Sequence, residues 1–220
     1  MKIAYFVHDL NDPAICRRLR MLHAAGVEVE HGVEADAGLA AGFDVVVLAT
    51  GARPYEPALP DEPGFAACQA WDAIADPAEI RGPALVADWG GGWEGLDAAE
   101  RLALAGVQVT LACAAPMPGE TLHQYQRNLY LARLDELGVT ILHHMALAQD
   151  GDRVALAHVF SQRTETLPET ATLVLAQGRV PADELWTGLE AHPGARRAGD
   201  VLSPRTMEEA VLEGTRAVRC

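Results

Sequence analysis

Closely spaced cysteines are missing from this sequence, and basic residues are few. Its four cysteines, Cys16, Cys68, Cys113 and Cys220, stand far apart, and no C-x-x-C occurs. This spacing encodes no local zinc site, iron–sulfur site or redox-active dithiol. Lysine and arginine together number 17 against 31 acidic residues, for a formal charge of −14. Because neutralising phosphates requires clustered Lys and Arg, we expect no nonspecific nucleic-acid binding.

Long apolar runs are missing as well. The apolar stretch at residues 3–7 ends at His8 and Asp9, so it is too short for a signal peptide. No run approaches the length that crosses a membrane. We therefore expect a cytoplasmic protein without a membrane partner. With 220 residues, half of them hydrophobic, the chain is long enough for one large domain or two small ones.

A glycine fingerprint between two apolar strands is the most informative motif that is present. Gly90, Gly92 and Gly95 form G-x-G-x-x-G after the apolar run 84–87, and a second apolar run follows at 107–113. In such a unit the first glycine permits the turn, the second lets the backbone approach a pyrophosphate, and the third lets helix and strand pack closely. The pattern predicts a Rossmann-type unit with phosphate at a helix N-terminus.

The acidic residue that holds the ribose in such sites is missing. It usually stands about twenty residues further on, at the end of the second strand. This sequence has Cys113, Ala114, Ala115 and Pro116 there, with no arginine for a 2′-phosphate. Two interpretations therefore stay open: a site for NAD(P)H, or a Rossmann-type unit that is kept for packing.

Further residues of the same turn are candidates for nucleotide contact. Gly91 continues its backbone. Glu94 stands where it would contact a ribose, repel a phosphate, or act as a solvated first-turn acid that favours the helix dipole. Trp93, with Trp89, would stack on a flavin or nicotinamide ring or pack between lobes. No metal site is predicted, because His143 and its neighbour in the strand point to opposite faces and form a poor chelate.

Alternating strands and helices surround this unit and predict an α/β protein. Residues 44–54 and 172–181 echo each other, since each is an apolar strand followed by a glycine, a basic residue and a proline. A proline-rich link at 53–63 suits a connection between two lobes. We interpret the pattern as a nucleotide-binding lobe interrupted by a second one. The chain would leave the first sheet near Gly51 and rejoin it near Leu173.

Four motifs, in order, resemble a known family. They are LATGARP at 48–54, DWGGGWEG at 88–95, AQGRVPADELW at 176–186 and AGDVLSPRTMEEAVLEG at 198–214. Over about residues 27–218 the chain is similar to the C-terminal FAD/NAD(P)-binding region of the NADH:flavin oxidoreductases of the trimethylamine dehydrogenase and 2,4-dienoyl-CoA reductase type.

The resemblance implies two interleaved Rossmann-like, glutathione-reductase-like lobes with parallel sheets. Residues 1–79 and 167–220 would form an FAD- or ADP-binding-like lobe, and residues 80–166 an inserted NAD(P)-binding-like lobe.

The resemblance also implies positions for the cofactor. Thr50, Gly51 and Gly178 would sit near the bound nucleotide of the FAD-like lobe. Gly199 and Asp200 would lie by the cofactor's ribityl or phosphate groups, at the N-terminus of the last helix. The expected ligands are FAD or ADP in the outer lobe and NAD(P)H in the inserted lobe.

The sequence departs from the family in two places. The family's Old Yellow Enzyme-like barrel, with its FMN and iron–sulfur cluster, is absent, so a barrel-type flavoprotein subunit is an expected partner. The family's first glycine fingerprint is replaced by residues 8–13, where the carboxylates of Asp9 and Asp12 would repel a pyrophosphate. The opening residues 1–26 instead resemble some glycosyltransferases, with His8 as a candidate catalytic residue.

Three functions follow from these observations. The first is an oxidoreductase module that binds a flavin or adenine dinucleotide and transfers reducing equivalents with a partner flavoprotein domain. The second is a noncatalytic nucleotide-binding or assembly module, or a truncated remnant of a flavin dehydrogenase, and the third is a glycosyltransferase-like fragment. No catalytic acid, base or nucleophile is nominated for the leading hypothesis, because hydride chemistry belongs to the cofactors.

Overall fold

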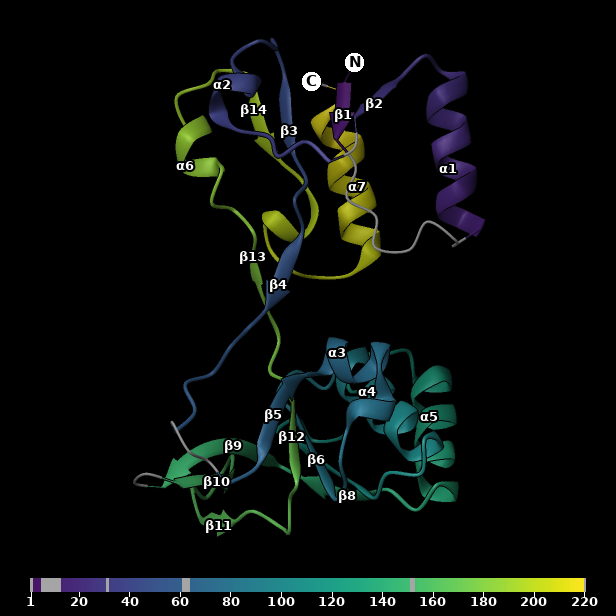
Figure 1. Cartoon of the computed structure of the whole chain (residues 1–220), viewed down its shortest axis with the longest axis vertical. Coiled ribbons are helices and arrows are strands. Elements are labelled where there is room, and N and C mark those ends of the chain that lie inside the picture. Colours follow the sequence, from purple (N-terminus) through teal and green to yellow (C-terminus); the bar gives the residue numbers. More distant parts are fainter. Residues whose placement is uncertain (1, 5–12, 31, 61–63, 151–152, 220) are drawn as a thin grey trace. The chain divides into compact units, whose positions relative to one another are not determined.

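The computed structural model of this chain describes residues 2–4, 13–30, 32–60, 64–150 and 153–219. The chain forms two compact units. The first unit combines Met1–Arg53 with Val180–Cys220, and the second is the continuous segment Pro54–Arg179 (Figure 1). The α/β class predicted from the alternation of strands and helices is confirmed.

A five-stranded parallel sheet, ordered β5-β12-β6-β7-β8, forms the middle of the second unit. Its strands are β5 (Ala66–Gln69), β6 (Ala84–Asp88), β7 (Val109–Cys113), β8 (Thr140–His143) and β12 (Thr172–Ala176). β6 and β12 are buried along their whole length. This burial is expected of parallel strands that are covered on both faces.

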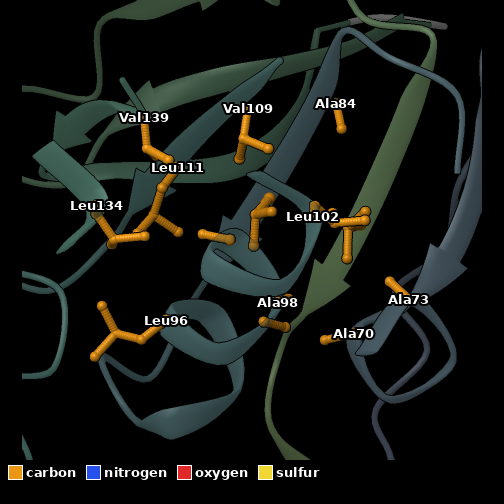
Figure 2. Packing of buried hydrophobic residues seen from close by; sticks show 14 of the residues in the cluster. Ala70, Ala73, Ala84, Leu96, Ala98, Leu102, Val109, Leu111, Leu134 and Val139 are labelled. Atoms are coloured by element: carbon orange, nitrogen blue, oxygen red, sulfur yellow. The ribbon is translucent and has the colours of Figure 1, made fainter. Parts of the chain in front are cut away.

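Three helices cover one face of this sheet. They are α3 (Ala70–Ala75), followed by the 3-10 turn η1 (Pro77–Glu79), α4 (Trp93–Leu104) and α5 (Gln124–Glu136). The helical spacing of Leu96, Ala99 and Leu102 places all three on the buried side of α4. Figure 2 shows the resulting core, in which helix residues meet strand residues: Ala70, Ala73, Leu96, Ala98, Leu102, Leu134, Ala84, Val109, Leu111 and Val139.

An antiparallel sheet of three strands covers the other face. Its strands are β9 (Met145–Asp150), β10 (Arg153–His158) and β11 (Thr164–Thr166), in the order β11-β10-β9. Because side chains alternate along a strand, Val86 of β6 joins the helical core while Leu85 and Ala87 pack with Leu156 of β10. The predicted hairpin is confirmed by the antiparallel pairing of β9 with β10, and its turn at 151–152 lies outside the described residues.

The position of Thr172–Ala176 corrects a prediction. The sequence predicted that this strand rejoins the first lobe, but β12 lies between β5 and β6 in the second unit. The two compact units divide after Arg53 and after Arg179, whereas the lobes were expected to divide after residues 79 and 166. An apolar run with a glycine end indicates a buried parallel strand, but it carries no information on which strands lie beside it.

The first unit contains two short parallel pairs of strands. β1 (Lys2–Ala4) pairs with β2 (Glu28–Glu30), and α1 (Pro13–Ala24) lies between them in sequence. β3 (Val46–Leu48) pairs with β14 (Ala195–Arg197). The chain between and after these strands forms α2 (Ala37–Ala40), α6 (Trp186–Leu189), the 3-10 turn η2 (Gly199–Val201) and α7 (Met207–Ala217).

The chain passes between the units twice, and a strand forms at each passage. These strands, β4 (Ala52–Pro54) and β13 (Arg179–Pro181), pair with each other as a two-stranded sheet. The prolines of the predicted link at 53–63 begin at the end of β4, in the extended conformation that a proline-rich connection favours.

Candidate functional site

Four of the predicted nucleotide contacts follow the ends of two adjacent strands in the first unit. β3 and β14 are parallel, with Leu48 opposite Arg197, and the Ala198 N–H donates to the Leu48 carbonyl at 3.0 Å. Thr50 and Gly51 come after β3, and Gly199 and Asp200 come after β14. Parallel strands end at the same edge of their sheet, and ligands of α/β proteins bind beyond the carboxyl ends of strands. The four residues therefore leave the sheet at the edge where a ligand is expected.

Thr50 and Gly51 are tied to the segment after β13. The Thr50 hydroxyl donates to the Ala182 carbonyl at 2.5 Å, and the Ala182 N–H donates to the Gly51 carbonyl at 3.0 Å. Gly51 has a φ of +79°, which an L side chain rarely adopts, and a Cβ built there would meet no atom within 4 Å. Its backbone is therefore open to close approach by a ligand.

Gly199 and Asp200 connect β14 to α7. The buried Gly199 donates its N–H to Oε2 of Glu213 at 2.8 Å, and Asp200 Oδ1 accepts the Arg205 N–H at 3.1 Å. Arg205 forms an ion pair with Glu213. A carboxylate from inside α7 thus holds the glycine turn that precedes this helix.

Gly178, the fifth candidate for the nucleotide of the FAD-like lobe, belongs to the second unit. It has a φ of +87° and accepts the Tyr55 N–H at 2.9 Å through its carbonyl. Thr50, Gly51, Gly199 and Asp200 belong to the first unit. The association of Gly178 with the nucleotide of the FAD-like lobe stays a prediction.

The glycine fingerprint forms the turn between β6 and α4 in the second unit. Gly92 is the N-cap residue of α4, and Gly91 has a φ of +59°. A Cβ on Gly91 would lie 2.8 Å from Cβ of Ala115, and a Cβ on Gly95 would lie 2.6 to 2.8 Å from atoms of the Asp88 side chain. The third glycine thus allows the close helix-to-strand packing that the pattern predicts.

Asp88, the last residue of β6, is a site residue that the sequence reasoning missed. Its side chain is 3% exposed, and its Oδ1 accepts the N–H groups of Gly90 and Gly91, both at 3.1 Å. The Cys113 thiol of β7 donates to Oδ2 across 3.8 Å. Burial raises the pKa of Asp88 to about 6, although these hydrogen bonds oppose the rise. The sequence could have predicted this role, because an Asp before a glycine turn often accepts hydrogen bonds from the backbone N–H groups two and three residues further on.

Glu94 and Trp93, the other predicted contacts in this turn, have protein partners. Glu94 Oε1 lies 3.1 Å from Nε of Arg179, and both side chains are about a quarter exposed, at 28% and 26%. Trp93 is 42% exposed and packs against Tyr130 in a T-shaped arrangement, with ring centroids 5.7 Å apart. Burial and a hydrogen bond to Asp97 raise the pKa of Tyr130 to about 12.

The remaining candidates are the histidine pair of the second unit and the residues near the N-terminus. The rings of His143 and His144 are 6.4 Å apart between centroids. Among the described residues, no three His, Cys, Asp or Glu side chains are grouped in a way that could hold a metal ion. His8, Asp9 and Asp12 lie outside the described residues. No helix within the described ranges has the length and apolarity needed to cross a membrane.

Two α/β units with parallel sheets make this a two-lobed protein of the glutathione-reductase-like class. Residues 18–202 match the family model of the pyridine nucleotide-disulphide oxidoreductases, and the chain belongs to this family of FAD/NAD(P)-binding domains. A search of curated protein sequences finds no match.

Solved structures share the fold at low sequence identity. Histamine dehydrogenase from Rhizobium sp. 4-9 aligns with a TM-score of 0.81 and 19% identity, over 99% of this chain and 39% of that one. A 2-naphthoyl-CoA reductase in complex with 2-naphthoyl-CoA aligns with a TM-score of 0.75 and 20% identity, over 94% of this chain and 32% of that one. Thioredoxin reductase of T. acidophilum aligns with a TM-score of 0.60 and 20% identity, over 93% of this chain and 78% of that one. The chain thus spans 39% and 32% of the length of the first two proteins. They are of the type that the four sequence motifs resemble.

Proposed function

We propose that this chain is an oxidoreductase module that holds FAD or ADP on its first unit. It would exchange reducing equivalents with a barrel-type flavoprotein partner. The observation that carries the proposal is the common edge of β3 and β14, beyond which Thr50, Gly51, Gly199 and Asp200 follow. Membership in a family of FAD/NAD(P)-binding domains supports it.

The residues at this edge fit an adenine nucleotide or flavin. The backbone of Gly51 faces open space, which suits close approach by a phosphate or ribose. Asp200 provides a carboxylate that can accept hydrogen bonds from sugar or ribityl hydroxyls. A bound FAD would supply the hydride and electron chemistry, while the residues of this chain bind it and orient it.

We expect a partner because the sequence has no C-x-x-C that would form a local redox-active dithiol. Within the part of the chain that the structure describes, Cys68 and Cys113 are free thiols. The matched histamine dehydrogenase and 2-naphthoyl-CoA reductase are two to three times longer than this chain, since it covers 39% and 32% of them. A barrel-type flavoprotein would supply the missing electron donor or acceptor.

Ligand-dependent stability tests this proposal. A ligand that binds the folded state raises the unfolding temperature, so FAD or ADP is expected to stabilise the protein. Asp200→Asn should weaken FAD binding by about tenfold, because a charge-assisted hydrogen bond is lost. Glu208→Gln is the matched control, since it removes an exposed charge from α7 of the same unit.

The outcomes separate the candidate functions. Stabilisation by FAD, with a flavin absorbance band, and loss of both in Asp200→Asn would support the proposal. Stabilisation by ADP without flavin binding would instead favour a noncatalytic nucleotide-binding module. Stabilisation by sugar nucleotides alone would favour the glycosyltransferase-like alternative, and no effect of any of these ligands would overturn nucleotide binding at this edge.

A further inference from the structure

We infer that Asp88 closes the glycine turn of the second unit to pyrophosphate, so that a dinucleotide does not bind there. Asp88 is then the residue that decides which unit takes the nucleotide. This inference deepens the proposed function and rests on it in one respect: if the module binds a nucleotide, the first unit is where it binds.

Two of the backbone donors that a pyrophosphate would use are already occupied. In a phosphate-binding glycine turn, the backbone N–H groups and the helix N-terminus point at the ligand. Here the N–H groups of Gly90 and Gly91 donate to Oδ1 of Asp88, each at 3.1 Å. A phosphate oxygen could replace this carboxylate only if the carboxylate lost both hydrogen bonds while it stayed buried, and leaving a buried charge without partners is costly.

Packing keeps Asp88 in this place. Its side chain is 3% exposed, Cys113 of β7 lies beside Oδ2, and Gly95 of α4 approaches so closely that a Cβ there would come within 2.8 Å of Oδ2. The carboxylate is therefore held between α4 and β7. A pyrophosphate would meet its negative charge in a site that water does not screen, where charges interact strongly.

Two other carboxylates near the turn, Glu94 and Glu120, add negative charge that also disfavours a pyrophosphate. Glu94, on the first turn of α4, adds a second carboxylate that raises the pKa of Asp88, and Glu120 does the same for the Cys113 thiol. Arg179 is engaged with Glu94 at 3.1 Å. After β7 the chain reads Cys113, Ala114, Ala115, so no carboxylate stands there for a ribose. The turn thus has the backbone of a dinucleotide site without its charge pattern.

Amide resonances of the turn test this inference directly. The 15N-labelled full chain is titrated with NAD⁺, whose pyrophosphate charges stay constant across the pH range used. In the wild type, the amide signals of Gly90 and Gly91 are expected to stay in place. In Asp88→Ala both N–H groups are released, so their signals should move on titration. NAD⁺ should then bind about tenfold more tightly or better at this turn.

Two further variants separate charge from folding. Asp88→Asn keeps the shape and an acceptor oxygen while removing the charge, so it should bind NAD⁺ more tightly than the wild type even if Asp88→Ala fails to fold. Asp135→Asn removes an exposed charge from α5, away from the turn, and should behave as the wild type does. Lowering the pH through about 6 should strengthen NAD⁺ binding by the wild type but not by Asp88→Asn.

Either of two results would overturn the inference. One is movement of the Gly90 and Gly91 signals in the wild type as large as that in Asp88→Ala. The other is Asp88 variants that bind NAD⁺ no better than the wild type and Asp135→Asn. Failure of the proposed function would give another result. The amide signals of Gly51 and Gly199 would then not shift on addition of FAD or ADP, in the wild type or in the Asp88 variants.

Discussion

The ionisation of Asp88 works against folding. Burial raises its pKa from 3.8 to about 6, so the folded protein binds this proton more tightly than the unfolded chain does. Between about pH 4 and pH 6 the folded state holds a proton that the unfolded state has lost. The free energy of unfolding contributed by Asp88 therefore falls as the pH rises through this window.

Asp88→Asn should reveal this effect as a pH-dependent gain in stability. Relative to the wild type, its free energy of unfolding is expected to rise by about 2 kcal/mol from pH 4 to pH 7, because a shift of one pKa unit is worth about 1.4 kcal/mol. Urea unfolding at a series of pH values measures the difference. Asp135→Asn serves as the control and should show no such trend, and a difference between Asp88→Asn and the wild type that stays constant with pH would contradict the prediction.

At the scale of elements, the contact between α4 and β6 depends on Gly95. A methyl group at this position would lie within 2.8 Å of three atoms of the Asp88 side chain, which are buried and cannot move aside. Gly95 is one of the buried residues of α4, a helix that contributes Leu96 and Leu102 to the core of the second unit. The glycine therefore sets how closely this helix approaches the sheet.

Two helical glycines offer a matched comparison. Gly95→Ala should lower the free energy of unfolding by about 1 to 3 kcal/mol, because the added methyl group overpacks a buried contact. Gly214→Ala in α7 should raise it by up to about 1 kcal/mol, because a Cβ there meets nothing within 4 Å and alanine favours a helix. Chemical denaturation of both variants gives the two values. If both substitutions changed the free energy of unfolding in the same direction, the contact with Asp88 would not be the cause of destabilisation in Gly95→Ala.

At the scale of the whole molecule, the second unit contains everything its core requires. Both buried clusters, one under the helices and one under the antiparallel sheet, draw their residues from Pro54–Arg179 alone. The first unit is assembled from two separate segments, Met1–Arg53 and Val180–Cys220. The second unit is thus the part of the chain with a continuous sequence and a complete core.

The segment 54–179, expressed alone, is expected to fold. Its amide spectrum should overlay the signals of the same residues in the full chain, and it should unfold in one cooperative transition, because its two clusters stay intact. A narrow, poorly dispersed spectrum of the segment would contradict this. The first unit's two pieces, which are not contiguous, provide the contrast and should stay unfolded when expressed separately.

Local patterns predicted much of the second unit. The strand, glycine turn, helix and strand around Gly90 correspond to β6, α4 and β7, because apolar periodicity and glycine positions act over a few residues. The helix around Leu134, which is buried, and the hairpin of β9 with β10 were predictable for the same reason. Four ordered motifs also led to the family that the comparisons support.

The neighbours of β12 could not be predicted in this way. Its residue Thr172 pairs with Ala66 on one side and Ala84 on the other, and both partners are distant in sequence. The echo between residues 44–54 and 172–181 suggested a shared sheet, but it reflects only that both strands are apolar and end at a glycine. Strand order depends on which helices and strands pack together, and that is a property of the folded unit.

What the sequence by itself determined is the α/β class, the glycine turn with its three spaced glycines, and the strand ends at Gly51 and Gly199 where a nucleotide is expected. Only the tertiary structure decided what the glycine turn contains. It brings Cys113 and Gly95 against Asp88 and so holds a carboxylate on the N–H groups of Gly90 and Gly91. The physical reason is that a backbone turn follows from local conformational preferences, whereas the group that fills its hydrogen bonds depends on burial and on neighbours brought together from distant parts of the chain.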